Sequence, residues 1–145
     1  MSECLFCSIV AGREKASVVY QDNHVTAFMD IQPINRGHVL VVPNSHAAYL
    51  DGLDETDGAR MFQTAQQITR ALRRSSLPCE GVNLFLADGA AAGQEVFHVH
   101  LHVVPRIAGD GHVWRMADHY YHLPGRADLD LAAKAIRNGL LREEA

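Results

Sequence analysis

The sequence predicts an α+β fold, in which a mainly antiparallel β-sheet packs against one long helix and one C-terminal helix. Three observations predict it: short β-rich segments bounded by turn formers, two segments with helical apolar spacing, and two strand candidates, 81–88 and 97–104, joined by a short loop. A parallel pair needs a crossover of a dozen or more residues, so the short link indicates antiparallel pairing.

The first predicted element is a hairpin in "SVVYQDNHVTAFMD" at 17–30, where two β-rich arms flank turn formers at 21–23. "HVLVVP" at 38–43 follows as a third strand, which Pro43 ends. Three strands therefore precede the first helical segment.

Helical spacing begins after Leu53 and ends at Leu77 and Pro78. Acidic residues open this segment and arginines close it, an order that stabilises a helix through its dipole. A second helix is predicted near 128–142. The apolar positions at helical spacing are Met61, Ala65, Ile68 and Leu72 in the first helix, and Leu129, Ala133, Ile136 and Leu140 in the second.

The last predicted strand carries three histidines in strict alternation with apolar residues, in "FHVHLHVVPR" at 97–106. This period is typical of a half-buried strand and would place His98, His100 and His102 on one face. With a rise of about 3.3 Å per residue, the outer pair is roughly 13 Å apart, too far for one metal to be bound by all three. The three histidines must therefore have different roles.

Composition limits the class of protein. The chain has 145 residues, 48% of them hydrophobic, which fits one globular domain with a real core. A formal charge of −4 gives no reason to expect nucleic acid or a membrane surface as a partner. Because no signal-peptide pattern and no run of about 18 apolar residues occurs, we expect a soluble, cytoplasmic protein.

The histidine row suits chemistry at phosphorus. A neutral imidazole held in one tautomer is a good nucleophile, and a second histidine can hold or donate the proton that the leaving group needs. The preceding loop, "GAAAGQE", offers the backbone amides around Gly93 and the side-chain amide of Gln94 to phosphate oxygens. The alternatives are a solvated strand face and a plain turn.

The three cysteines, an odd number, argue against a disulfide framework. Cys4 and Cys7 form a C-x-x-C pair with zinc-site spacing, which by itself is half a site. Free or redox-active thiols are the alternatives.

These motifs resemble the histidine triad (HIT) superfamily of nucleotide hydrolases and transferases, whose pattern His-φ-His-φ-His-φ-φ is matched by "HVHLHVV" at 98–104. The resemblance covers about 4–111, and from it we expect a single HIT domain over 1–145, with a tail and helix at 112–145. The similar stretches, in the order of bacterial members, are "CLFCSIVAG" at 4–12, "VTAFMDIQPINRGHVLVVPNSH" at 25–46 and "AAGQEVFHVHLHVVPRIAGDG" at 91–111.

The resemblance implies a two-step reaction at the α-phosphate of a purine nucleotide. His100 would be the nucleophile that forms a covalent nucleotidyl-histidine, which water then hydrolyses. His102 would contact the phosphate and assist proton movement, and Gln94 would approach the phosphates or the leaving group.

The resemblance also implies the nucleoside contacts. Asp30 matches the position that holds ribose hydroxyls, Ile31 would line the nucleoside pocket, and His38 matches a further family histidine near the triad. Without the resemblance, a turn former at a strand end is an equally good interpretation of Asp30.

Some members of the family bind zinc through such a cysteine pair, a histidine of a "P-x-x-H" segment and the first triad histidine. Here these are Cys4, Cys7, His46 and His98, which would form a closed Cys2His2 structural site, with no organic cofactor. The resemblance also implies a homodimer whose sheet continues across the subunits.

Two positions depart from the family pattern. Ala87 stands where members often have Asn or Gln, and Glu95 where they often have Ser or Thr. Ala87 cannot form a side-chain hydrogen bond with a substrate. A carboxylate at Glu95 would repel a polyphosphate, and we therefore expect it to favour an amine leaving group.

The function predicted from the sequence is cleavage of a nucleoside phosphoramidate or a dinucleoside polyphosphate through a covalent nucleotidyl-histidine. Within enzymes, the alternative is a nucleotide phosphorylase or adenylyltransferase that uses the same intermediate. From another class, it is a zinc-stabilised nucleotide-binding module with little turnover, which the nucleophile at His100 argues against. A metallohydrolase conflicts with the span of the histidine row and with a closed four-ligand site.

Overall fold

The computed structural model describes residues 4–112 and 114–143, and the chain divides after His112 into two compact units. The first unit contains all five strands and the helices α1 (Leu5–Val10) and α2 (Glu55–Arg74), and the second contains the helix α3 (Arg126–Glu143). The predicted domain bounds, 1–145, extend beyond the described residues at both ends. That the chain acts as one domain therefore stays a prediction.

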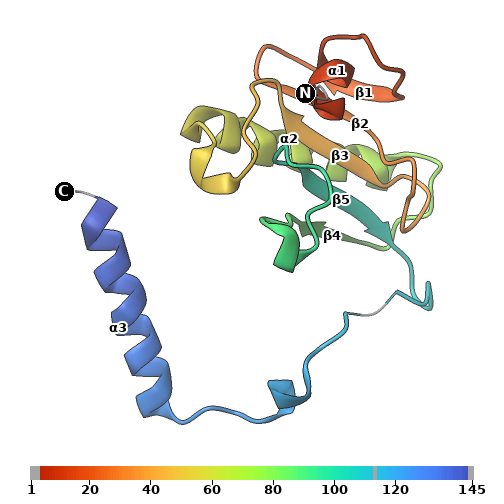
Figure 1. The fold of residues 1–145 in the computed structure, drawn as a ribbon. Helices are drawn as coiled ribbons and strands as arrows, with labels where there is room; N and C mark the ends of the chain where they lie inside the picture. Colours follow the sequence, from red (N-terminus) through yellow and green to blue (C-terminus); the bar gives the residue numbers. More distant parts are fainter. Residues whose placement is uncertain (1–3, 113, 144–145) are drawn as a thin grey trace. The chain divides into compact units, whose positions relative to one another are not determined.

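The first unit is built on a five-stranded sheet in the order β1-β2-β3-β5-β4 (Figure 1). Every neighbouring pair is antiparallel, which confirms the predicted α+β class. The strands are β1 (Val18–Gln21), β2 (Val25–Met29), β3 (Val39–Pro43), β4 (Gly81–Phe85) and β5 (Leu101–Arg106).

Both faces of the central strands are buried. Successive side chains of a strand point to opposite faces, so each face has its own set of buried residues. Val39 and Val41 of β3 belong to the core beneath α2, which packs against β2, β3 and β5. Leu40 and Val42 belong to a smaller core on the other face, with Phe6 of α1. The helix α2 behind the sheet and the short α1 therefore cover opposite faces (Figure 1).

The helix α2 begins as predicted, with Asp54 as its N-cap accepting hydrogen bonds from the amides of Thr56 and Asp57. It ends at Arg74, a little before the predicted end, because Ser75 turns into an extended conformation and its Oγ bonds back to the Leu72 carbonyl. The predicted hairpin, third strand and C-terminal helix are also confirmed.

The predicted histidine strand at 97–104 is wrong in its first half. The ladder with β3 begins at the pair Val41 and Leu101, whereas the amide of Val99 bonds to the carbonyl of Ala47. Residues 98–100 are all buried, so the segment leaves the sheet and enters the interior instead of presenting one face to water. The strand predicted at 81–88 similarly ends at Phe85, where its pairing with β5 stops.

Among the described residues, four short features had no counterpart in the prediction, and two of them are single helical turns at Leu50–Gly52 and Ala90–Ala92. The six-residue helix α1 carries Cys7 and follows Cys4, and a single turn at Asp118–Tyr121 precedes α3. Among the described residues, no helix is both long and apolar enough to cross a membrane.

Candidate active site and metal site

A cavity of about 510 Å³ lies between α1, the end of β2 and the loop before β5. Leu5, Phe6 and Ile9 of α1 and Phe28 and Met29 of β2 form part of its apolar wall, and its polar lining includes histidines, two carboxylates, a lysine and a glutamine. Among the residues singled out from the sequence, those that line it are Asp30, Ile31, His38, Ala87, Gly93, Glu95, His100 and His102.

His100 is buried, and its hydrogen bond fixes which nitrogen can react. Its Nδ1 lies 2.7 Å from the carbonyl oxygen of His98, so Nδ1 carries the hydrogen and donates it. In a neutral imidazole the other nitrogen then has the lone pair. Nε2 is therefore the nitrogen of His100 that is free to accept a proton or to attack an electrophile.

A chain of hydrogen bonds fixes His38 and His102 in the same way. The amide of Ile34 donates to Nδ1 of His38 at 3.1 Å, so the hydrogen of His38 is on Nε2. That Nε2 lies 2.9 Å from Nδ1 of His102 and donates to it. His102 therefore carries its own hydrogen on Nε2, where it can donate to an anion.

Burial lowers the pKa of both of these histidines and so favours their neutral forms. Burial, together with the nearby His100, lowers the pKa of His102 to about 4. Burial also lowers the pKa of His38, against the opposing effect of the Asp30 carboxylate. The ring of His102 stacks on Phe85 at 4.1 Å between centroids and 11° between planes, which fixes its orientation.

Asp30 and Ile31 lie at the end of β2, at the rim of the cavity. One oxygen of Asp30 accepts the amide of Gln32 at 2.8 Å, and the other lies 3.5 Å from Nε2 of His38. The side chain of Ile31 is 98% exposed, so an apolar ligand surface would remove it from water.

Gln94 is placed differently from its expected role. It is buried and does not line the cavity: its oxygen accepts the amide of Gly89 at 2.7 Å, and its nitrogen donates to the carbonyls of Ala48 and Val96 at 2.8 and 3.2 Å. The side chain therefore shapes the loop, whereas Gly93 next to it lines the cavity. That Gln94 approaches a phosphate stays a prediction.

The four residues proposed as zinc ligands come together near the start of α1. The donor atoms of Cys4, Cys7, His46 and His98 all lie within 4.8 Å of one another. Nδ1 of His98 is 3.5 Å from Sγ of each cysteine, and Nδ1 of His46 is 3.4 Å from Sγ of Cys7 and 3.3 Å from Nδ1 of His98.

These distances fit tetrahedral zinc. Bonds of about 2.3 Å to sulfur and 2.0–2.1 Å to nitrogen require about 3.5 Å between S and N and about 3.3 Å between two N atoms. Nε2 of His98 bonds to the carbonyl of Pro43 at 2.8 Å, which leaves the lone pair on Nδ1, toward the cysteines. The residues present therefore fit a Cys2His2 metal site.

A second group, Asp30, His38 and His102, also brings its donor atoms within 4.8 Å. It differs in its protons, because the Ile34 amide makes Nε2 of His38 a donor. That nitrogen has no lone pair to offer a metal. The two groups thus differ: His98 belongs to the candidate metal site, and His102 to a chain of hydrogen bonds with His38.

The two departures from the family pattern both line the cavity. Ala87 is buried, and Glu95 is exposed at the point where the cavity adjoins a surface groove beside Cys4, Cys7 and His46. A ligand at His100 that extends toward this groove would pass the Glu95 carboxylate.

Sequence reasoning missed the groups that orient the histidines. Phe6 contacts the rings of His98 and His100 edge-on, and the backbone of Ile34 fixes the tautomer of His38. The one available signal was the position of Phe6, between the two cysteines. A backbone amide leaves no signal in the sequence.

Comparisons with known proteins agree with this geometry. A family model described as HIT domain matches residues 11–109. An uncharacterized HIT-like protein of Methanocaldococcus jannaschii is 38% identical over 134 residues, which are 92% of this chain and 98% of that protein.

The chain is also similar to solved structures of histidine triad proteins. A Zn-bound histidine triad family protein from Mycobacterium smegmatis is 43% identical, with a TM-score of 0.73, over 79% of this chain and 83% of that one. A HIT family hydrolase from Legionella pneumophila Philadelphia 1 is 33% identical, with a TM-score of 0.63, over 70% of this chain and 91% of that one.

Proposed function

This chain belongs to the HIT family, and on that premise we propose that it hydrolyses a purine nucleotide at the α-phosphate through a covalent nucleotidyl-histidine. The substrate class is a nucleoside phosphoramidate or a dinucleoside polyphosphate. The observation that carries the proposal is the tautomer of His100, whose Nδ1–H is bound to the His98 carbonyl while Nε2 belongs to the cavity-lining ring.

The first step forms a bond from Nε2 of His100 to the α-phosphorus and breaks the bond from phosphorus to the leaving group. The leaving nitrogen or oxygen takes the electron pair of that bond and must gain a proton. In the second step a water oxygen attacks the same phosphorus and gives up a proton, which balances the proton gained by the leaving group. The bond from phosphorus to Nε2 breaks, and the nucleoside monophosphate leaves.

His102 supports both steps as a hydrogen-bond donor. Its Nε2–H would bind a non-bridging phosphate oxygen, and His38 behind it holds this tautomer and spreads positive charge that develops. Asp30 at the cavity rim would hold the ribose hydroxyls, with Ile31 against the base.

Zinc would be held by Cys4, Cys7, His46 and His98. The similarity of this chain to the Zn-bound protein from M. smegmatis supports this assignment. Four protein ligands leave no open position for substrate, so the metal would act by fixing structure. We further propose a homodimer, as the family resemblance implies.

The proposal is tested by intact-protein mass after brief mixing with an adenosine 5′-phosphoramidate or a diadenosine polyphosphate. We expect an adduct of the mass of AMP, or turnover, with the unsubstituted protein and with His119→Ala, and neither with His100→Ala. His119 is an exposed histidine outside the cavity. Nucleotide binding without adduct or turnover would instead support the binding module. Release of nucleoside diphosphate in the presence of inorganic phosphate would support the phosphorylase.

Glu95 is proposed to select the leaving group. It lies where the cavity opens toward the groove, so its carboxylate would repel a polyphosphate and tolerate an amine. We expect Glu95→Thr and Glu95→Gln to raise kcat/KM for a dinucleoside polyphosphate relative to a phosphoramidate by about tenfold, equivalent to about 1.4 kcal/mol. Unchanged relative rates in both variants would contradict this role.

A further inference from the structure

The helix α1 and the residue before it contribute to both the candidate metal site and the cavity. Cys4 directly precedes its first turn and Cys7 lies within it, while Leu5, Phe6 and Ile9 line the cavity. One short helix therefore supplies ligands to one site and a wall to the other.

The helix α1 is too short to be stable by itself. It has six residues, and no side chain caps its N-terminus, whereas isolated helices shorter than about 12–15 residues are marginal in water. Phe6 packs it into the smaller core, and Nε2 of Gln21 donates to the carbonyl of Val10 at 3.2 Å. A metal bound to Cys4 and Cys7 would tie the helix to His46 and His98, which lie far away in the sequence.

A second connection runs through His98 to the nucleophile. Nδ1 of His98 is one of the four candidate metal donors. The backbone carbonyl of the same residue accepts the Nδ1–H of His100 at 2.7 Å. The ring of Phe6 forms T-shaped contacts with both imidazoles, with 5.9 Å between ring centroids for His98 and 5.2 Å for His100. Metal donors, Phe6 and the nucleophile thus form one continuous set of contacts.

We propose that the metal site is a positioning device for the active site: metal bound to Cys4 and Cys7 holds α1 as a wall of the nucleotide cavity and, through His98 and Phe6, fixes the imidazole of His100. Nucleotide affinity then depends on the metal, although the metal does not touch the nucleotide. This inference rests on the proposed function, because it takes a nucleoside monophosphate as the ligand of the cavity.

The test compares the zinc-loaded full chain with the same protein after chelation, by calorimetric titration with AMP and by hydrogen exchange. We expect the Kd for AMP to rise by at least about tenfold on chelation. The amides of Ser8 and Ala11, which donate to the carbonyls of Cys4 and Cys7, should lose protection while those of α2 keep theirs, because α2 packs on the other face of the sheet. Re-addition of Zn²⁺ should restore both. Cys7→Ser should behave like the chelated protein, and Cys79→Ser, a change outside the cluster, should not.

An unchanged Kd after chelation would overturn the inference, since apolar packing alone would then hold α1. Parallel loss of protection in α1 and α2 would overturn it as well, because the metal would then support the whole fold. Zinc-loaded protein that binds no AMP would contradict the proposed function, and the hydrogen-exchange arm would still decide whether the metal holds α1.

Phe6 provides a second test that leaves the ligands intact. We expect Phe6→Ala to bind one equivalent of zinc, yet to lower kcat and raise the Kd for AMP, and Phe6→Leu, which restores most of the apolar volume, to recover the Kd better than kcat. The reason is that Phe6 makes a T-shaped ring contact with His100, which the side chain of leucine cannot reproduce. Wild-type kcat and Kd in Phe6→Ala would contradict the positioning role.

Discussion

Two backbone groups decide what the active-site histidines can do. The carbonyl of His98 takes the hydrogen of His100 on one ring nitrogen, and the amide of Ile34 places the hydrogen of His38 on the nitrogen that faces His102. The result is one acceptor nitrogen, on His100, and one donor nitrogen, on His102. The alternating histidines in the sequence predicted that such roles must differ, but the roles themselves depend on backbone geometry.

The first prediction at this scale concerns His38. His38→Leu removes both hydrogen bonds, so His102 loses its fixed tautomer, and we expect kcat/KM to fall by about 100-fold, within the usual range for acid–base groups. His38→Gln can still accept from Ile34 through its oxygen and donate to His102 through its nitrogen, and should retain much of the activity. Steady-state kinetics of both variants are the measurement, and equal losses in both would show that packing, not the proton chain, is what His38 supplies.

The second prediction is the effect of pH on stability. Burial depresses the pKa of His102 from 6.5 to about 4, so between these values the unfolded chain binds a proton that the folded protein does not. The free energy of unfolding should therefore fall as the pH drops from 6.5 toward 4, by up to about 1.4 kcal/mol per pH unit for one group.

Urea unfolding of the zinc-loaded protein at pH 7 and pH 5 measures this dependence. His102→Gln, which has no titrating ring, should flatten it. The lowered pKa of His38 acts in the same direction and remains in that variant, so a residual slope is expected. An identical slope with and without His102 would contradict the prediction.

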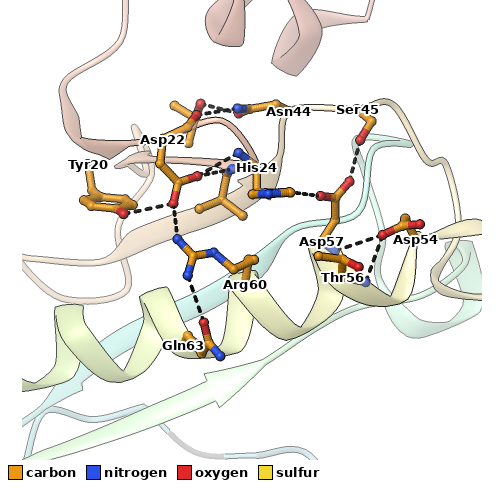
Figure 2. A network of polar contacts seen from close by, with 12 residues as sticks. Tyr20, Asp22, His24, Asn44, Ser45, Asp54, Thr56, Asp57, Arg60 and Gln63 are labelled. Atoms are coloured by element: carbon orange, nitrogen blue, oxygen red, sulfur yellow. Dashed lines mark hydrogen bonds and ion pairs between the residues drawn. The ribbon is translucent and has the colours of Figure 1, made fainter.

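At the scale of elements, a polar network joins α2 to the hairpin and to the loop after β3, as Figure 2 shows. Asp57 in the first turn of α2 accepts Ser45 Oγ at 2.5 Å and lies 2.8 Å from Nδ1 of His24. One turn later, Arg60 pairs with Asp22 at 2.7 Å. Ser45 directly precedes the predicted metal ligand His46, so this network also supports the loop that carries it.

The third prediction tests that network. The hydrogen bonds from Ser45 and His24 lower the pKa of Asp57, which shows that its charged form is stabilised in the fold. We expect Asp57→Asn to reduce the free energy of unfolding by about 1–3 kcal/mol, because it weakens charge-assisted hydrogen bonds at a buried site. Asp51→Asn, at an exposed aspartate, should stay within about 0.5 kcal/mol of the parent. Denaturant unfolding measures both variants. Equal effects would show that the network does not stabilise the fold.

The elements also show which parts of the fold could be predicted. The hairpin and α2 follow patterns long enough to display their period, and Asp54 marks the start of the helix. The helix α1 has six residues, too few to reveal helical spacing. The alternation at 97–100 resembles a strand, yet there the Val99 amide bonds to Ala47 instead of continuing the ladder, a tertiary choice that no local pattern contains.

At the scale of the whole molecule, the two sites exist because the first unit covers its sheet on both faces. The short α1 and the loop before β5 together enclose the cavity on one face, and α2 supports the other. The pattern of apolar residues predicted strands covered by helices. The grouping of Cys4, Cys7, His46 and His98 could be predicted only from the family resemblance, because these residues are up to 94 positions apart.

The last prediction is the oligomeric state. Within its own unit, the helix α3 leaves large apolar side chains uncovered, among them Leu131 at 67% and Ile136 at 66% exposure. Exposed apolar surface of this kind is typical of an interface, so we expect sedimentation equilibrium at micromolar concentration to give twice the chain mass of 16.0 kDa. Leu131→Glu combined with Ile136→Glu should shift the protein toward the monomer, because burying two carboxylates in an apolar interface is costly. Lys134→Glu combined with Arg137→Glu adds acidic residues to the same helix and should leave the mass unchanged. A monomeric parent would contradict the proposed homodimer, whereas a dimer that resists both double variants would place its interface away from these two side chains.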